Sequence, residues 1–240
     1  MSETLPLRKV TAPPSRSPRE QVGPVRAFSA FSFRDLYTRV LLGLQAQQHQ
    51  VLGVTSAIQG EGKTTIAAAL AAAIAEDDAL IGFGRDPNTT LLIECNEGVQ
   101  PEDPRLALRP GPGLTQLLRG ESTLEAAIQE TNIERLSILP AGEPAHNLPL
   151  AIRTAALPDL ITQLRPRFGL IILDLPAVLN STDTQVLARL ADQLVLVVRA
   201  GVTPAKLVRE ALDELGEEML LGIVLNDSQP DLPSWLDNRL

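Results

Sequence analysis

The stretch from Val51 to Glu76 constrains the fold of this chain more than any other part of the sequence. It reads VLGVTSAIQGEGKTTIAAALAAAIAE, which is an apolar run, a loop with glycines at positions 60 and 62, and an alanine-rich segment. The loop fits G-x-x-x-x-G-K-[ST] except that Ala57 occupies the first position. A strand, a phosphate-binding loop and a helix in this order are typical of an α/β nucleotide-binding domain.

The predicted roles of the loop residues follow from their chemistry. The glycines let successive backbone N–H groups curl around a phosphate, and the helix that begins near Lys63 adds the positive end of its dipole. Lys63 is expected to reach the β- and γ-phosphates, and the Thr64 hydroxyl to bind Mg²⁺. The predicted nucleotide-binding residues of this stretch are Gly60, Glu61, Gly62, Lys63, Thr64 and Thr65.

Strand-like and helix-like patterns alternate along the rest of the chain. Strands are predicted at 90–95, 135–140, 168–174, 193–199 and 219–225. This alternation predicts an α/β fold, a doubly wound and mostly parallel sheet in a single P-loop domain. We expect a disordered proline-rich tail over 1–28, the nucleotide-binding domain over 29–228 and a short tail over 229–240.

Three shorter patterns refine this outline. Apolar residues from Phe31 to about Gln48 recur at helical spacing, which predicts an amphipathic helix that docks on the domain or on a neighbouring subunit. Thr203-Pro204 predicts a helix N-cap followed by proline at the first helical position. The run LIILD ends at Asp174, and open α/β sheets bind ligands at such strand tips. With a phosphate loop upstream, Asp174 is predicted to hold the Mg²⁺ water shell opposite Lys63.

Composition excludes several classes of protein. The net charge of −8 and the isoelectric point near 4.9 argue against a nonspecific nucleic-acid binder. The sequence has no run of 18 apolar residues and no signal-peptide core, which predicts a cytoplasmic protein. A single cysteine, Cys95, excludes an internal disulfide. With only two histidines besides this cysteine, the sequence argues against a zinc site.

Over residues 31–227 the chain resembles the bacterial tyrosine kinases of capsule and exopolysaccharide systems, which are P-loop proteins of the MinD/ParA group. The matching stretches are VTSAIQGEGKTT, TLLIEC, GLTQLLRGESTLEAAI, LSILPAGEPAHN, LIILDLPAVLNSTD and DQLVLVVRAGVTPAKLVREAL, followed by LGIVLND. Partition-type ATPases of the wider group carry a signature lysine where this chain has Ile58. The kinase branch is therefore favoured.

The resemblance implies a set of ligands, site residues and partners. It implies ATP and Mg²⁺, with Lys63, Asp174 and Glu94 as catalytic residues and with Thr64 and Asp174 as metal ligands. It places Asn226 and Asp227 near the adenine. It also implies a membrane partner, a chain-length-determinant (Wzz-like) protein, and leaves a homo-oligomer open.

The sequence departs from the family pattern at three places. The family has D-x-D-x-R after its second strand, whereas this chain has Glu94, Asn96 and Gly98 at the three defined positions. The tail after Ser228 contains no tyrosine, so an acceptor would lie on another protein or be Tyr37. Of the family's E-x-x-R-x-x-R assembly motif only the arginine at Arg34 is kept.

The sequence is therefore compatible with three functions. The leading one is a Mg·ATP-dependent tyrosine kinase of exopolysaccharide synthesis or export, with Glu94 as the candidate base. The second is a pseudokinase that binds ATP and acts as a switch or scaffold, because Asn96 cannot accept a proton. The third is a MinD-like membrane ATPase, which would need a basic amphipathic C-terminal helix that this sequence does not supply.

Overall fold

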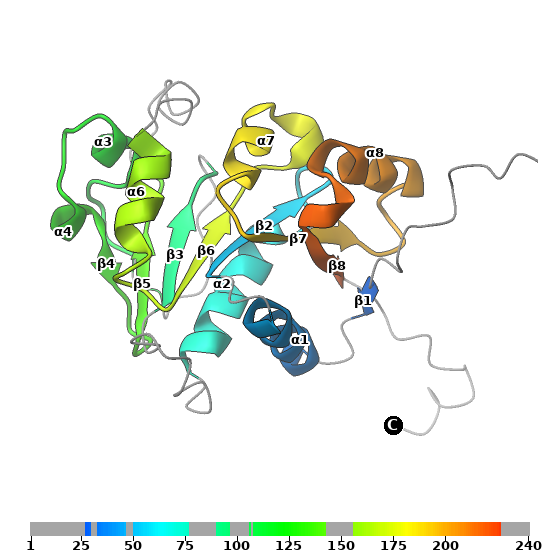
Figure 1. Cartoon of the computed structure of the whole chain (residues 1–240), viewed down its shortest axis with the longest axis horizontal. Coiled ribbons are helices and arrows are strands. Elements are labelled where there is room, and N and C mark those ends of the chain that lie inside the picture. Colours follow the sequence, from blue (N-terminus) through cyan, green and yellow to red (C-terminus); the bar gives the residue numbers. More distant parts are fainter. Residues whose placement is uncertain are drawn as a thin grey trace, which may run out of the picture.

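The structure is a computed structural model that describes residues 27–29, 33–46, 50–76, 90–96, 106, 108–142 and 156–226. Its centre is an eight-stranded sheet in the order β1-β8-β7-β2-β6-β3-β5-β4 (Figure 1). The strands are β1 (Ala27–Ser29), β2 (Val51–Ser56), β3 (Thr90–Glu94), β4 (Gln129–Glu130), β5 (Leu136–Leu139), β6 (Leu170–Asp174), β7 (Gln193–Arg199) and β8 (Leu220–Asn226). Among these strands only β4 runs antiparallel to its neighbour, so the predicted mostly parallel α/β sheet is confirmed.

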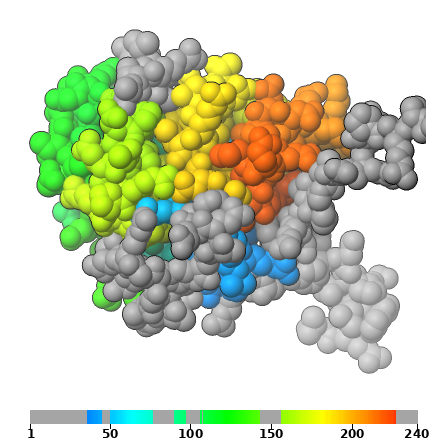
Figure 2. All heavy atoms as spheres, viewed as in Figure 1, coloured from blue at the N-terminus to red at the C-terminus, as the bar shows by residue number. Residues whose placement is uncertain are grey.

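Helices cover both faces of the sheet, as a doubly wound fold requires (Figure 1). They are α1 (Phe33–Ala46), α2 (Lys63–Ala75), α3 (Leu114–Leu118), α4 (Leu124–Ala127), α6 (Ala156–Leu164), α7 (Asp183–Ala188) and α8 (Ala205–Leu215), with short 3₁₀ turns η3 (Val178–Asn180) and η4 (Glu217–Met219). Helices α1 and α2 pack on one face, and α6, α7 and α8 pack on the other. In Figure 2 the atoms of α6, α7 and α8 lie side by side across the upper part of the molecule.

Strand β2, which carries the phosphate loop, lies at the centre of the sheet. Every residue of β2 is buried, and β2 pairs in parallel with β6 on one side and β7 on the other. Its partners are far away in sequence, since Val51 lies beside Ile171 and Leu52 beside Gln193. Burial along its whole length is expected for a strand that helices cover on both faces of the sheet.

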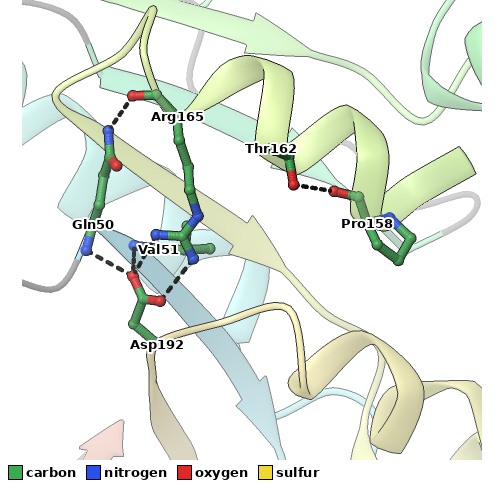
Figure 3. A network of polar contacts seen from close by, with 6 residues as sticks. All are labelled: Gln50, Val51, Pro158, Thr162, Arg165 and Asp192. Atoms are coloured by element: carbon green, nitrogen blue, oxygen red, sulfur yellow. Dashed lines mark hydrogen bonds and ion pairs between the residues drawn. The ribbon is translucent and has the colours of Figure 1, made fainter. Parts of the chain in front are cut away.

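A polar cluster fixes the amino-terminal end of β2 (Figure 3). The Asp192 carboxylate accepts the backbone N–H groups of Gln50 and Val51, each at 2.8 Å, and both terminal nitrogens of Arg165 at 2.7 and 3.0 Å. Burial alone would raise the pKa of Asp192, but the Arg165 fork and the two backbone amides outweigh burial and hold that pKa below its usual value. One carboxylate thus joins the start of β2, the end of α6 and the start of β7.

Helix α1 packs against the domain itself. Leu36, Val40 and Leu44 are buried in the core cluster that contains α2 and the sheet, while Leu42 on the opposite side is 59% exposed. The predicted amphipathic helix is therefore confirmed, with its apolar side docked within the chain. None of the described helices is long and apolar enough to cross a membrane.

The ends of the domain differ in part from the prediction. Residues 27–29 form β1 beside β8, although positions 27 and 28 were assigned to the disordered tail. A strand of three residues at the edge of the sheet is held by backbone pairing. It therefore needs no periodic side-chain pattern, and no pattern in the sequence indicated it. The rest of the predicted N-terminal tail and the predicted tail over 229–240 lie outside the described residues.

Candidate nucleotide-binding site

The phosphate loop, residues 57–62, joins the carboxyl end of β2 to the start of α2 and is held from two sides. On the side of β6 and η3, the backbone N–H of Gln59 donates to Asn180 Oδ1 at 3.0 Å, and that of Leu179 donates to the Ala57 carbonyl at 3.1 Å. On the side of β8, the Asn226 amide nitrogen donates to the Glu61 carbonyl oxygen at 3.0 Å. The loop therefore lies at the strand ends where open α/β sheets bind their ligands.

Both loop glycines adopt a conformation that other residues avoid. Gly60 has φ 87° and Gly62 has φ 88°. A Cβ at position 62 would also lie 2.2 Å from the amide nitrogen of Asn226. Helix α2 follows without a side-chain N-cap, so its first N–H groups are not capped by a side chain of the protein. Uncapped N–H groups at a helix start, next to a glycine loop, suit an anion such as phosphate.

The loop threonine and the tip of β6 are in direct contact. Thr64 Oγ1 donates to Asp174 Oδ2 at 2.8 Å, and both residues are buried. Lys63 is buried beside them, and its positive charge favours the ionised form of Asp174. The structure thus brings the predicted residues Lys63, Thr64 and Asp174 together at one point.

A second carboxylate, Glu94, lies on the strand next to Asp174. The two residues are partners in the parallel register of β3 and β6, and neighbouring strands are about 4.8 Å apart. Glu94 is 1% exposed. Within the described part of the chain, neither Glu94 Oε1 nor Asp174 Oδ1 has a hydrogen-bond partner. Two buried carboxylate oxygens without a donor mark a place that a cation or a proton can occupy.

The electrostatics of the pair agree with this geometry. Burial raises the pKa of Glu94 from 4.5 to about 7; the Ala141 N–H opposes this shift and the nearby Asp174 adds to it. Burial raises the pKa of Asp174 from 3.8 to about 6 against the opposing effects of Lys63 and the Thr64 hydroxyl. Near neutral pH each of the two carboxyl groups is therefore close to its own pKa, so each can gain or lose a proton.

Two residues that position Glu94 were missed by the sequence analysis. The backbone N–H of Ala141 donates to Glu94 Oε2 at 3.1 Å. The carbonyl of Ala141 in turn accepts the N–H of Thr115 at 3.1 Å and its hydroxyl at 2.8 Å. Ala141 belongs to LSILPAGEPAHN, one of the stretches that match the family, but no local sequence rule predicts its contact with Glu94.

The donor set fits Mg²⁺ with phosphate oxygens as additional ligands. Mg²⁺ prefers oxygen ligands and is usually bound by one or two carboxylates together with substrate phosphates and water. Thr64 and Asp174 supply a hydroxyl and a carboxylate, and the unpartnered oxygens lie beside them. In the described ranges no cluster of three or more His, Cys, Asp or Glu side chains forms a closed metal cage.

The remaining predicted residues have distinct places. Thr65 is exposed on the first turn of α2, as an α-phosphate contact requires. The carboxylate of Glu61 is buried and bound to other parts of the protein, which leaves only its backbone to face a ligand. Asn226 lies against the phosphate loop, and Asp227 is outside the described residues. Cys95 is buried, and burial raises the pKa of its thiol.

Comparison with known proteins gives relatives along most of the chain. No protein-family model matches it. It is 31% identical over 221 residues to the succinoglycan biosynthesis transport protein ExoP of Rhizobium meliloti, covering 90% of this chain but only 27% of ExoP. It is 28% identical over 209 residues to the tyrosine-protein kinase CpsD of Streptococcus agalactiae, covering 83% of this chain and 84% of CpsD.

Solved structures show the same fold. The BceF tyrosine kinase domain matches with a TM-score of 0.68 and 28% identity over 81% of this chain and 75% of the BceF chain. The kinase domain of the Escherichia coli tyrosine kinase ETK matches with a TM-score of 0.71 at 24% identity, over 81% of this chain and 73% of that one. Pyrococcus horikoshii MinD with Mg-ADP matches in fold with a TM-score of 0.59 at 23% identity, over 78% and 75%.

Proposed function

Because the chain belongs to the bacterial tyrosine-kinase family within the MinD/ParA group of P-loop proteins, we propose that it binds Mg·ATP and transfers the γ-phosphoryl group to protein tyrosine. The observation that carries the proposal is the contact between Thr64 and Asp174 at the mouth of the phosphate loop. Glu94 lies beside them with a free carboxylate oxygen. A phosphate site, a metal site and a candidate base are thus adjacent.

Each residue has a defined task in this reaction. The loop N–H groups and Lys63 bind and orient the phosphates, and Thr64 and Asp174 hold Mg²⁺. Mg²⁺ held by these two residues would supply positive charge that offsets the negative charge of the phosphates. Glu94 Oε1 accepts the proton of the tyrosine hydroxyl as the new bond to the γ-phosphorus forms and the bond to ADP breaks. A carboxyl group with a pKa of about 7 suits this task at neutral pH. Glu94 therefore takes the role that Asn96 cannot fill.

The acceptor is expected to lie on another protein. Tyr37 is the single tyrosine of the sequence. It lies on α1, is half-buried and packs against the core cluster of that face. Phosphorylation of Tyr37 would require α1 to leave this packing, so an external tyrosine is the better substrate.

We place the protein in exopolysaccharide or capsule synthesis and export. ExoP is named for transport in succinoglycan biosynthesis, and CpsD is named a tyrosine-protein kinase. This chain spans 27% of ExoP and 84% of CpsD. The partner that we propose is a membrane protein that determines polysaccharide chain length.

The test is transfer of γ-labelled phosphate from ATP to a tyrosine-containing polypeptide in the presence of Mg²⁺. We expect label on tyrosine with the wild-type protein and with Tyr37→Phe. Lys63→Ala should lose the label because the phosphates are no longer held. Glu94→Gln should lower the rate constant for transfer about 100-fold while ATP still binds, since a general base contributes roughly 10²–10⁴-fold.

A separate measurement of ATP binding divides the alternatives. Absence of label together with ATP binding that depends on Lys63 would replace the kinase by a nucleotide switch. If Asn96→Asp then acquired transfer activity, the altered acidic motif would be the cause. Absence of both label and ATP binding in the wild-type protein would refute the proposed function altogether.

A further inference from the structure

The side chain of Glu61 is unusual for a residue in the middle of an exposed loop. Its neighbours Gln59 and Gly60 are exposed, yet Glu61 is 2% exposed. A buried carboxylate is costly unless hydrogen bonds replace its water shell. Oε2 of Glu61 accepts the backbone N–H of Ile58 at 2.8 Å. Oε1 accepts the backbone N–H of Arg199 at 3.1 Å and the hydroxyl of Thr203.

These bonds connect the phosphate loop to the β7–α8 turn, residues 199–203. Within that turn the N–H groups of Val202 and Thr203 both donate to the carbonyl of Arg199, at 3.2 and 3.0 Å. The turn is exposed at its tip, where Val202 is 62% exposed. Thr203 was predicted to cap α8, but Pro204 occupies the N-cap position and the Thr203 hydroxyl donates to Glu61 instead.

The main chain of Glu61 has a second fixed orientation. Its carbonyl oxygen accepts the Asn226 amide at 3.0 Å, and the described peptide bonds are all trans. In a trans peptide the C=O and the next N–H point in opposite directions. The N–H of Gly62 therefore points away from Asn226. The hydrogen bond between Asn226 and the Glu61 carbonyl fixes the peptide plane and thereby the direction of this N–H.

We infer that Glu61 is a positioning residue that holds the phosphate loop in its nucleotide-binding shape and couples it to the β7–α8 turn. This inference rests on the proposed function in so far as ATP is the ligand of the loop. Ordering a loop on binding costs affinity, and a loop that is ordered beforehand avoids that cost. The same link makes nucleotide occupancy and order of the turn rise together, because coupling between two sites is reciprocal.

The chemistry explains why the residue is a glutamate rather than a glutamine. All three partners of the carboxylate donate hydrogen bonds to it. An amide side chain of the same shape would place an NH₂ group against Ile58 N–H or against Arg199 N–H. Either orientation sets a donor against a donor, although the volume of the side chain is unchanged. A role in packing alone would tolerate this substitution.

The experiment compares Glu61→Gln, Thr203→Val and Thr203→Ser with the wild-type protein. Thr203→Val keeps the shape of the side chain and removes the hydroxyl, while Thr203→Ser keeps the hydroxyl. The readouts are the Kd for a fluorescent ATP analogue with Mg²⁺, the melting temperature, and hydrogen exchange of the amides of residues 199–203 with and without ATP.

We expect Glu61→Gln to raise the Kd about tenfold and Thr203→Val to raise it about threefold, with Thr203→Ser within twofold of wild type. ATP should slow hydrogen exchange in the turn of the wild-type protein and of Thr203→Ser, but not in Glu61→Gln. The double variant Glu61→Gln/Thr203→Val should have a Kd close to that of Glu61→Gln alone, because both changes break one link.

Three results would overturn the inference. The first is a Kd for both Glu61→Gln and Thr203→Val that equals the wild-type value while the wild-type protein binds ATP. The second is a melting temperature that falls without any change in Kd or in the ATP-dependent exchange. The third is a wild-type protein that does not bind ATP, which would refute the proposed function as well. Loss of phosphotransfer with intact ATP binding would refute only the kinase activity and leave the link standing.

Discussion

Replacing Glu94 by glutamine should change how the stability of the metal-free protein depends on pH. A buried acid whose pKa is raised binds its proton more tightly in the folded state, so the free energy of unfolding falls as pH rises from the unfolded to the folded pKa. For Glu94 these values are 4.5 and about 7, and for Asp174 they are 3.8 and about 6. Between pH 5.5 and 8.5 the Glu94 carboxyl accounts for a loss of about 2 kcal/mol and Asp174 for about 1 kcal/mol.

The wild-type protein should therefore lose about 3 kcal/mol over this range, and Glu94→Gln about 1 kcal/mol. The amide oxygen of the variant still accepts the Ala141 N–H, so the fold is retained. Urea unfolding followed by circular dichroism at several pH values with EDTA measures both slopes. Glu134→Gln removes the same charge at an exposed position and should keep the wild-type slope. Equal slopes for wild type and Glu94→Gln, or a flat wild-type curve, would refute the reasoning.

Five further substitutions, two of them controls, test the phosphate loop, helix α1 and the polar cluster at the amino-terminal end of β2. Gly62→Ala should abolish ATP binding, whereas Gly120→Ala, at φ 71° with open space around it, should cost about 1 kcal/mol in a melt and leave ATP binding unchanged. Val40→Ala should lower the free energy of unfolding by about 2 kcal/mol, and Leu42→Ala on the exposed side by less than about 0.5 kcal/mol in urea titrations. Asp192→Asn should cost about 2–4 kcal/mol in the same titration, because an amide cannot accept all four donors; an unchanged midpoint would contradict this.

Sequence patterns predicted those parts of the fold that depend on residues adjacent in the sequence. Strand β7 begins at Gln193 and ends at Arg199 as expected, because these two polar residues flank its apolar run. Asp174 lies at the tip of β6 beside Thr64, as a phosphate loop followed by a buried strand ending in aspartate indicated. The order of the strands had no such local cause. At β2 it depends on pairing between residues more than 100 positions apart, as in Val51 with Ile171.

Features of the site that depend on hydrogen bonds between residues far apart in the chain could not be predicted from the sequence either. Glu61 was assigned to the nucleotide, but its carboxylate binds residues 138 and 142 positions further along the chain. Thr203 has the composition of a helix cap, and the competing acceptor on Glu61 takes its hydroxyl. Asn226 was placed near the adenine by resemblance, and that placement stays a prediction; its contact with the phosphate loop emerged only from the structure.

The central place of β2 has a consequence for the order in which the protein can form. Both strands that flank β2 follow it by more than 100 residues, and the loop contacts at Arg199, Thr203 and Asn226 come later still. Contacts of such sequence separation form slowly, because the chain between them must be closed first. On the ribosome, the phosphate loop therefore emerges long before anything that can hold it, and a nascent chain that has reached only residue 169 has neither neighbour of β2. The phosphate-loop end of the sheet should therefore become ordered only after residues 170–226 have been synthesised.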